Sequence, residues 1–189
     1  MAKFWNFLVS GAKRLPRKTK PWDGATSKLM ESIKVVPFKG TNSVLFSARL
    51  LGRPYPVMYM GSKRTMQAAY GVLIQFTGVE ILDNPPEGND LWTKDYKEIE
   101  YNRQKYYIRK IDVKKNPMLV RCSCKDYFFT WRWENFKYNA LYGALGRKYI
   151  RKTPPPPAGY PYRNPTKVTG FCRHIYQVMM LLKNNDWMY

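Results

Sequence analysis

Two stretches of sequence decide the fold: MLVRCSCKDY at residues 118–127 and GFCRHIYQVMMLL at residues 170–182. The chain has three cysteines and one histidine, and all of them fall in these stretches, as Cys122, Cys124, Cys172 and His174. Thiolate sulfur and imidazole nitrogen in a set of four are the ligands of a closed tetrahedral zinc site. The pattern therefore predicts one structural Zn2+ ion, with iron as the alternative metal. The competing interpretation is three buried thiols and a hydrogen-bonded core histidine without metal.

The spacing of the four residues also predicts their local structure. Side chains alternate between the two faces of a strand, so Cys122 and Cys124 would point to the same side. Residues i and i+2 of a helix point about 200° apart, so Cys172 is expected in a turn and His174 in the first helical turn. Gly170 would give the chain a flexible approach to that turn. Apolar residues then recur at helical spacing up to about residue 183, namely Ile175, Val178, Met179 and Leu182.

The sequence before the first stretch has strand composition. SVLFSARLL at residues 43–51 and PYPVMYMGS at residues 54–62 are separated by Gly52-Arg53-Pro54, which predicts a hairpin turn. The segment 62–71 fits either a short helix or a loop.

Further strands are predicted closer to the cysteines. GVLIQFTGVEIL at residues 71–82 is rich in β-branched residues and phenylalanine. Residues 98–113 predict one or two strands, and KKNP at residues 114–117 predicts the turn that follows. We therefore expect a mostly antiparallel sheet across residues 43–124.

The charge of the chain is large and uneven. The formal net charge is +20, from 33 basic and 13 acidic residues. Residues 1–20 contain six bases and no acid, residues 21–100 contain nine of each, and residues 101–189 contain eighteen bases and four acids. Such a distribution attracts polyanions, which include nucleic acids, anionic membranes and acidic protein surfaces.

The N-terminal segment, residues 1–40, is expected to be a helix followed by a basic arm. Residues 3–14 place five apolar side chains on one helical stripe, namely Phe4, Trp5, Leu8, Val9 and Ala12. This helix would dock either on its own domain or on a partner or membrane surface. Four bases in this segment are candidate partner-binding residues: Lys13, Arg14, Arg17 and Lys18.

The 47 residues between Cys124 and Cys172 contain two unusual stretches. The first, residues 125–142, interleaves aromatic rings with Lys125, Arg132 and Lys137, as in a stacking platform with phosphate contacts. The alternative, which the composition favours, is that most of these rings form core around the metal. The second, residues 146–167, is rich in proline and has no acid, and would form either a surface loop or an extended basic arm that binds a partner. Its candidate binding residues are Arg147, Lys148, Arg151 and Lys152.

The ligand order C-x-C…C-x-H, followed by an apolar helix, resembles the SWIM-type zinc finger over about residues 105–183. The resemblance implies a zinc-bound strand–strand–helix module that binds nucleic acid or protein and is not catalytic by itself. The 47-residue gap is longer than is usual for that family. KDYFFTWRWENFKYNALYG at residues 125–143, with the proline-rich insertion and the CRHIY motif, is similar to small SWIM-containing proteins of tailed phages. That similarity implies a role in the virion or in a DNA transaction.

Catalysis is not expected. A metal with four protein ligands has no open position for water, and the single histidine is already used as a ligand. The H-x-E with C-x-x-C pattern of zinc deaminases and the phosphate-loop motif are both missing from the sequence. We therefore expect neither an enzyme nor a small-molecule substrate.

The predicted fold class is α+β: a mostly antiparallel sheet, then the zinc module, with the basic N-terminal arm in front. The predicted divisions are residues 1–40, a β-rich region at 41–104, and a zinc module at 105–189 that carries the insertion 146–167. The expected function is a structural protein, such as a minor phage virion component, that docks on neighbouring virion or assembly proteins. The alternative is a DNA- or RNA-binding protein that contacts the backbone without sequence specificity.

The cellular location of the protein is predicted from its cysteines and its hydropathy. An odd number of cysteines held by metal favours a reducing compartment or the virion over the secretory route. Residues 4–9 are too short for a secretory signal, and no run approaches the roughly 18 apolar residues of a membrane span. We therefore expect no integral membrane segment.

Overall fold

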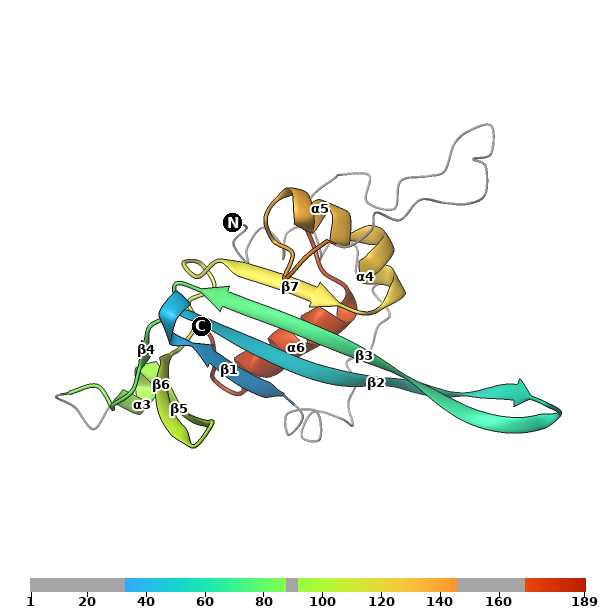
Figure 1. The fold of residues 1–189 in the computed structure, drawn as a ribbon, viewed down its shortest axis with the longest axis horizontal. Coiled ribbons are helices and arrows are strands. Elements are labelled where there is room, and N and C mark those ends of the chain that lie inside the picture. The colour runs from blue at the N-terminus through green and yellow to red at the C-terminus, as the bar shows by residue number, and fades with distance from the viewer. Residues whose placement is uncertain (1–32, 88–91, 146–168) are drawn as a thin grey trace.

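The computed structural model describes residues 33–87, 92–145 and 169–189 and shows a mixed α+β fold with antiparallel sheets, as predicted (Figure 1). The elements are β1 (Lys34–Phe38), the 3-10 helix η1 (Lys39–Thr41), β2 (Ser43–Tyr59), β3 (Ser62–Thr77), β4 (Ile81–Leu82), α3 (Trp92–Asp95), β5 (Tyr96–Tyr101), β6 (Gln104–Arg109), β7 (Met118–Cys122), α4 (Lys125–Thr130), α5 (Arg132–Lys137) and α6 (Arg173–Asn184). The helix predicted at residues 3–14 and the proline-rich stretch 146–167 lie outside the described residues. Among the described helices, none is long and apolar enough to cross a membrane.

The main sheet has the strand order β1-β2-β3-β7, with every pair antiparallel. Its register aligns Val35, Phe46, Ile74 and Val120 in one row across the four strands. Because side chains alternate along each strand, such rows build one continuous apolar face. The predicted stripe of α6 packs there and is buried, and each buried side chain of this size stabilises the fold by about 1.5–3 kcal/mol.

The two edge strands of the main sheet are β1 and β7. β1 falls within the stretch grouped with the N-terminal arm, and the sequence did not reveal it because Pro37 interrupts a short strand. Proline is tolerated there because β1 is an edge strand. At the opposite edge the chain after α5 returns to β7, where Val120 donates to the Ala140 carbonyl at 2.9 Å and accepts from Tyr142 at 3.2 Å. This return covers part of the β7 edge.

The first hairpin differs from the sequence-based prediction. Gly52-Arg53-Pro54 is not a turn but lies at a register shift within the continuous strand β2, between Leu51 and Pro54. The turn is formed by Met60 and Gly61, whose φ angles of 48° and 76° are those of a two-residue hairpin turn. The segment 62–71, predicted as helix or loop, is the first part of β3. A bulge accommodates glycine and proline in a strand, so the cross-strand partner overrides the local turn signal.

The second sheet has the order β4-β6-β5. The prediction of one or two strands within residues 98–113 is confirmed as the β5–β6 hairpin, which turns at Asn102 and Arg103. The C-terminal residues join this region to α6, because Ile111 donates to Trp187 at 2.8 Å and accepts from Tyr189 at 3.1 Å. Figure 1 shows the resulting arrangement, with the small sheet at one end of the main sheet.

Candidate metal centre

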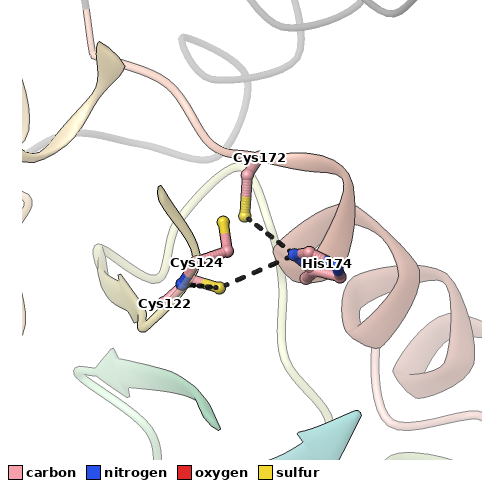
Figure 2. A group of neighbouring side chains, drawn as sticks. All are labelled: Cys122, Cys124, Cys172 and His174. Atoms are coloured by element: carbon pink, nitrogen blue, oxygen red, sulfur yellow. Dashed lines mark hydrogen bonds between the residues drawn. The ribbon is translucent and has the colours of Figure 1, made fainter. Parts of the chain in front are cut away.

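The four predicted ligands lie together (Figure 2). Their ligand atoms are all within 4.8 Å of one another, and Cys122 Sγ and Cys172 Sγ are each 3.9 Å from His174 Nδ1. A tetrahedral ion with bonds of about 2.3 Å to sulfur and about 2.0 Å to nitrogen separates such ligands by roughly 3.6 Å. The donor set and its spacing therefore fit one metal ion and are consistent with a zinc-binding site.

Each ligand occupies the end of a secondary-structure element. Cys122 is the last residue of β7, where it pairs with Val72 of β3. Cys124 is the N-cap of α4 and Cys172 the N-cap of α6, both with extended backbone angles. His174 is in the first turn of α6, so the prediction of a turn cysteine followed by a helical histidine is confirmed. The extended backbone at Cys124 keeps both thiols of the first pair on the buried side.

Backbone amides stabilise the first pair of sulfurs. The Cys124 amide donates to Cys122 Sγ at 3.4 Å, and the Tyr127 amide donates to Cys124 Sγ at 3.3 Å. Ser123, between the two cysteines, is bonded to β3 twice: its amide donates to the Gly71 carbonyl at 3.0 Å, and its hydroxyl accepts from the Gly71 amide at 2.9 Å. The C-x-C segment is therefore fixed to the main sheet before any ion binds.

The three thiols shift one another's acidity. Hydrogen bonds from Cys122 and Cys172 lower the pKa of Cys124 far below its ordinary value, while the bond to Cys124 raises the pKa of Cys122 to about 12. Burial, followed by the bonds to the other two thiols, raises the pKa of Cys172 strongly. These pKa shifts favour one thiolate in the buried cluster and oppose a second. A divalent cation reverses this balance, so its binding releases protons.

The histidine side of the cluster is covered by an aromatic ring. All three cysteines are buried. The whole His174 residue is partly exposed, whereas the ligand atoms of the cluster are buried. The burial of the ligand atoms determines how easily solvent reaches a bound ion. The ring of Tyr70, on β3, stacks on the imidazole with centroids 4.3 Å apart and planes 25° apart. Tyr70 therefore fixes the ring orientation that presents Nδ1 to the thiols, a contact that the sequence motif did not indicate.

A buried amide connects the two halves of the ligand set. Asn135 of α5 is fully buried; its side chain donates to the Gly170 carbonyl at 2.8 Å and accepts from the Gly170 amide at 2.9 Å. It also donates to the Tyr127 hydroxyl at 3.0 Å, and that hydroxyl donates to the Val120 carbonyl at 2.7 Å. Asn135 therefore joins β7 and α4 to the segment that leads into Cys172. Nothing in the local sequence distinguishes it from a solvent-exposed helical asparagine.

Gly170 has a different role from the one expected. Its backbone has no left-handed φ angle, so conformational freedom is not the reason for glycine here. A Cβ atom at this position would lie 2.3 Å from two carbon atoms of the Trp131 indole. Glycine is required because the buried Trp131 ring packs directly on the backbone.

The predicted binding residues are only partly within the described structure. Lys125 and Lys137 are exposed, with Lys137 paired to Glu134 at 2.8 Å, and the Arg132 guanidinium lies 4.8 Å from the centre of the Phe128 ring. The remaining eight lie outside it: Lys13, Arg14, Arg17, Lys18, Arg147, Lys148, Arg151 and Lys152.

The rings of the aromatic stretch divide between core and surface. Tyr127 and Trp131 are buried, as the core interpretation predicts. Phe136 and Tyr138 are 44% and 53% exposed. These two rings, on and just after α5, are available for contact with a partner.

Comparison with protein-family models, with curated proteins and with solved structures finds no match to this chain.

Proposed function

We propose that the chain is a non-enzymatic interaction protein whose fold is fastened by one structural zinc ion. The observation that carries the proposal is the Cys3His cluster, in which a single ion would have four protein ligands and no open position for water. Three thiolates and an imidazole in a tetrahedral set favour zinc over metals that prefer oxygen ligands or open sites. The ligand order and the helix α6 after the second pair support the resemblance to SWIM modules.

The ion would act as a fastener between distant segments. It would bind the end of β7 to the beginning of α6 and so hold out the 47 residues that lie between Cys124 and Cys172. Function then depends on the surfaces that this arrangement presents.

The partner we propose is a neighbouring protein in a virion or similar assembly. Support comes from the similarity to small tailed-phage proteins and from the exposed Phe136 and Tyr138 beside Lys137. Exposed aromatic rings bordered by charged residues are typical of protein interfaces.

Site-specific crosslinking in assembled particles tests this proposal. A photoreactive phenylalanine analogue at position 138 should capture one identified virion protein, read out by mass spectrometry. The matched control is the same analogue at position 189, where Tyr189 is 62% exposed, and it should give no such product. If neither position 136, on α5, nor position 138, just after it, captures a virion protein, the docking function is wrong.

A second candidate function, backbone-directed nucleic-acid binding, is favoured by the charge distribution. Residues 101–189 contain eighteen bases and four acids. A protein that neutralises about six phosphates loses roughly 10³-fold in affinity between 50 and 200 mM salt. A salt dependence much shallower than this would argue against nucleic-acid binding.

A further inference from the structure

The β2–β3 hairpin extends far beyond the rest of the main sheet (Figure 1). β1 pairs with β2 only as far as Ser47, and β7 pairs with β3 only from Val72 onward. From residue 49 to residue 70 the two strands therefore pair only with each other among the described strands, and we call this segment the arm. Its β2 half, residues 49–59, has a length of about 35 Å at 3.3 Å per residue.

Three apolar side chains of the arm are exposed. Leu50, at its base, is buried, but Leu51, Met60 and Met66 are 46%, 89% and 52% exposed. A two-stranded ribbon alone is marginally stable in water, and its unpaired edges favour association with another molecule. These features are those of a binding element.

The charge of the arm indicates which class of partner it fits. Residues 44–79 contain four bases, Arg49, Arg53, Lys63 and Arg64, and no acidic residue. The register places Lys63 and Arg64 opposite Met58 and Val57, close to the turn at Met60 and Gly61. A purely basic ribbon complements a polyanion.

The shape of the arm narrows the partner to double-stranded DNA. A two-stranded β-ribbon fits within a groove of B-form DNA, whereas the deep, narrow major groove of A-form RNA excludes it. The turn presents Met60, whose side chain is 89% exposed. Methionine is among the side chains that architectural proteins insert between base steps to kink the duplex.

We propose that the arm enters a groove of double-stranded DNA, that its bases contact phosphates, and that Met60 acts as a wedge between base pairs. The proposal rests on the second candidate function and assigns to it an element, a partner and a deformation of that partner. A neighbouring protein as the occupant of the arm is an outcome of the test below.

The first experiment compares the full chain with an arm-shortened variant, in which residues 52–68 are replaced by Asn-Gly. This change retains the Leu51–Ala69 pair and the base of the hairpin. Binding to a 30-base-pair duplex is measured by fluorescence anisotropy between 50 and 200 mM salt. The variant lacks Arg53, Lys63 and Arg64, so the slope of log K against log salt should fall by about 2.7 for three lost phosphate contacts. Its affinity at 100 mM salt should fall at least about tenfold.

The second experiment tests the wedge. End-to-end energy transfer in the doubly labelled duplex should report a bend of about 20–90° with the wild-type chain. Met60→Ala should abolish most of that bend, with little change in the salt slope. The matched control is Met180→Ala, because Met180 is also partly exposed, at 39%, but lies on α6.

The outcomes distinguish a failure of the arm proposal from a failure of nucleic-acid binding in general. If the shortened variant binds with the wild-type slope and affinity, the arm proposal is overturned and nucleic-acid binding stands. If the wild-type chain does not bind DNA at all, both are overturned, and a protein becomes the partner of the arm. Equal bending by the wild type and Met60→Ala overturns the wedge. Circular dichroism and metal content confirm that each variant retains the folded body.

Discussion

At the scale of single residues, the centre depends on side chains that do not touch an ion. Asn135 holds the Gly170 segment and Tyr127 by three hydrogen bonds, and all of these groups are buried. If one partner is removed, the others stay buried without a hydrogen bond to replace those that they made with water in the unfolded chain. Asn135 is therefore expected to matter for stability as much as a large core residue.

Replacing Asn135 by alanine should lower the free energy of unfolding by about 2–4 kcal/mol, since two buried backbone groups and a hydroxyl lose a partner. Urea titration of the metal-loaded chain measures the change. Asn184→Ala, at the exposed end of α6, is the control and should stay within about 0.5 kcal/mol of wild type. An equal effect of the two substitutions would contradict the role given to Asn135.

Gly170→Ala should destabilise the chain by at least about 1–3 kcal/mol, because the new methyl group collides with the Trp131 ring. Gly40→Ala is a matched control, since a Cβ there meets nothing within 4 Å. Thermal unfolding of the two variants side by side measures the difference. Similar melting temperatures would show that the close contact at Gly170 is not a constraint.

A buried lysine gives the chain a stability that depends on pH. The side chain of Lys110 is 8% exposed and its ammonium is 2.5 Å from Asp186, whose pKa is lowered, chiefly by that hydrogen bond. A carboxyl group with a lowered pKa contributes stability that is fully present above its unfolded pKa of about 3.8 and is lost as the pH falls through the lower folded value.

Asp186→Asn should therefore destabilise the chain modestly at pH 7, because Asp186 is largely exposed and solvent screens its ion pair with Lys110. Below the folded-state pKa of Asp186, which is itself lower than 3.8, the difference from wild type should shrink, because the carboxyl is then protonated in both states. Urea titrations at the two pH values measure it. A difference that stayed constant with pH would refute the assignment.

At the scale of elements, the sequence was most informative where the pattern was strongly periodic. The helix after His174 was predicted with its buried stripe, because four apolar residues at helical spacing leave one consistent interpretation. The β5–β6 hairpin and the strand before Cys122 were predicted for the similar reason that alternation and turn residues agreed.

Elements that depend on distant partners were not predictable in the same way. The sequence predicts a turn at Gly52-Arg53-Pro54 because these residues are a strong local turn signal. In the structure they lie in a bulge of the long β2–β3 hairpin, because β2 pairs with β3 on both sides of them. β1 depends on β2 for its existence. α4 and α5 are each six residues long and lie in an aromatic stretch whose composition does not indicate helix.

At the scale of the whole molecule, the ligand set joins two regions that the sequence analysis predicts as separate, the β-rich region and the zinc module. β7, which carries Cys122, is a strand of the same sheet as β1, β2 and β3, and α6, which carries His174, packs on that sheet. The centre is therefore built into the main core. The metal quartet was predictable from residue types and order alone, whereas its supports, Asn135, Tyr70 and Ser123, come from elsewhere in the fold.

Removal of the metal should consequently disturb more than the module at residues 105–183. Structural zinc contributes on the order of 10 kcal/mol to folding in small fingers, and here β7 would transmit the loss to β3. Hydrogen exchange after treatment with a chelator should show lost protection in α6 and β7 first, with weaker protection in β3. Unchanged protection in all three elements would contradict a fastening role.

The zinc content of the purified chain distinguishes one zinc ion held by four protein ligands from a cluster of metal-free thiols. Mass spectrometry of the metal should find one zinc per wild-type chain, one per Ser123→Ala chain as control, and close to none in Cys124→Ala. Ser123 is the neighbour that supports the C-x-C segment without being a ligand. A wild-type chain without zinc, or a Cys124→Ala chain that retains a full equivalent and melts like wild type, would rule out a four-ligand zinc site.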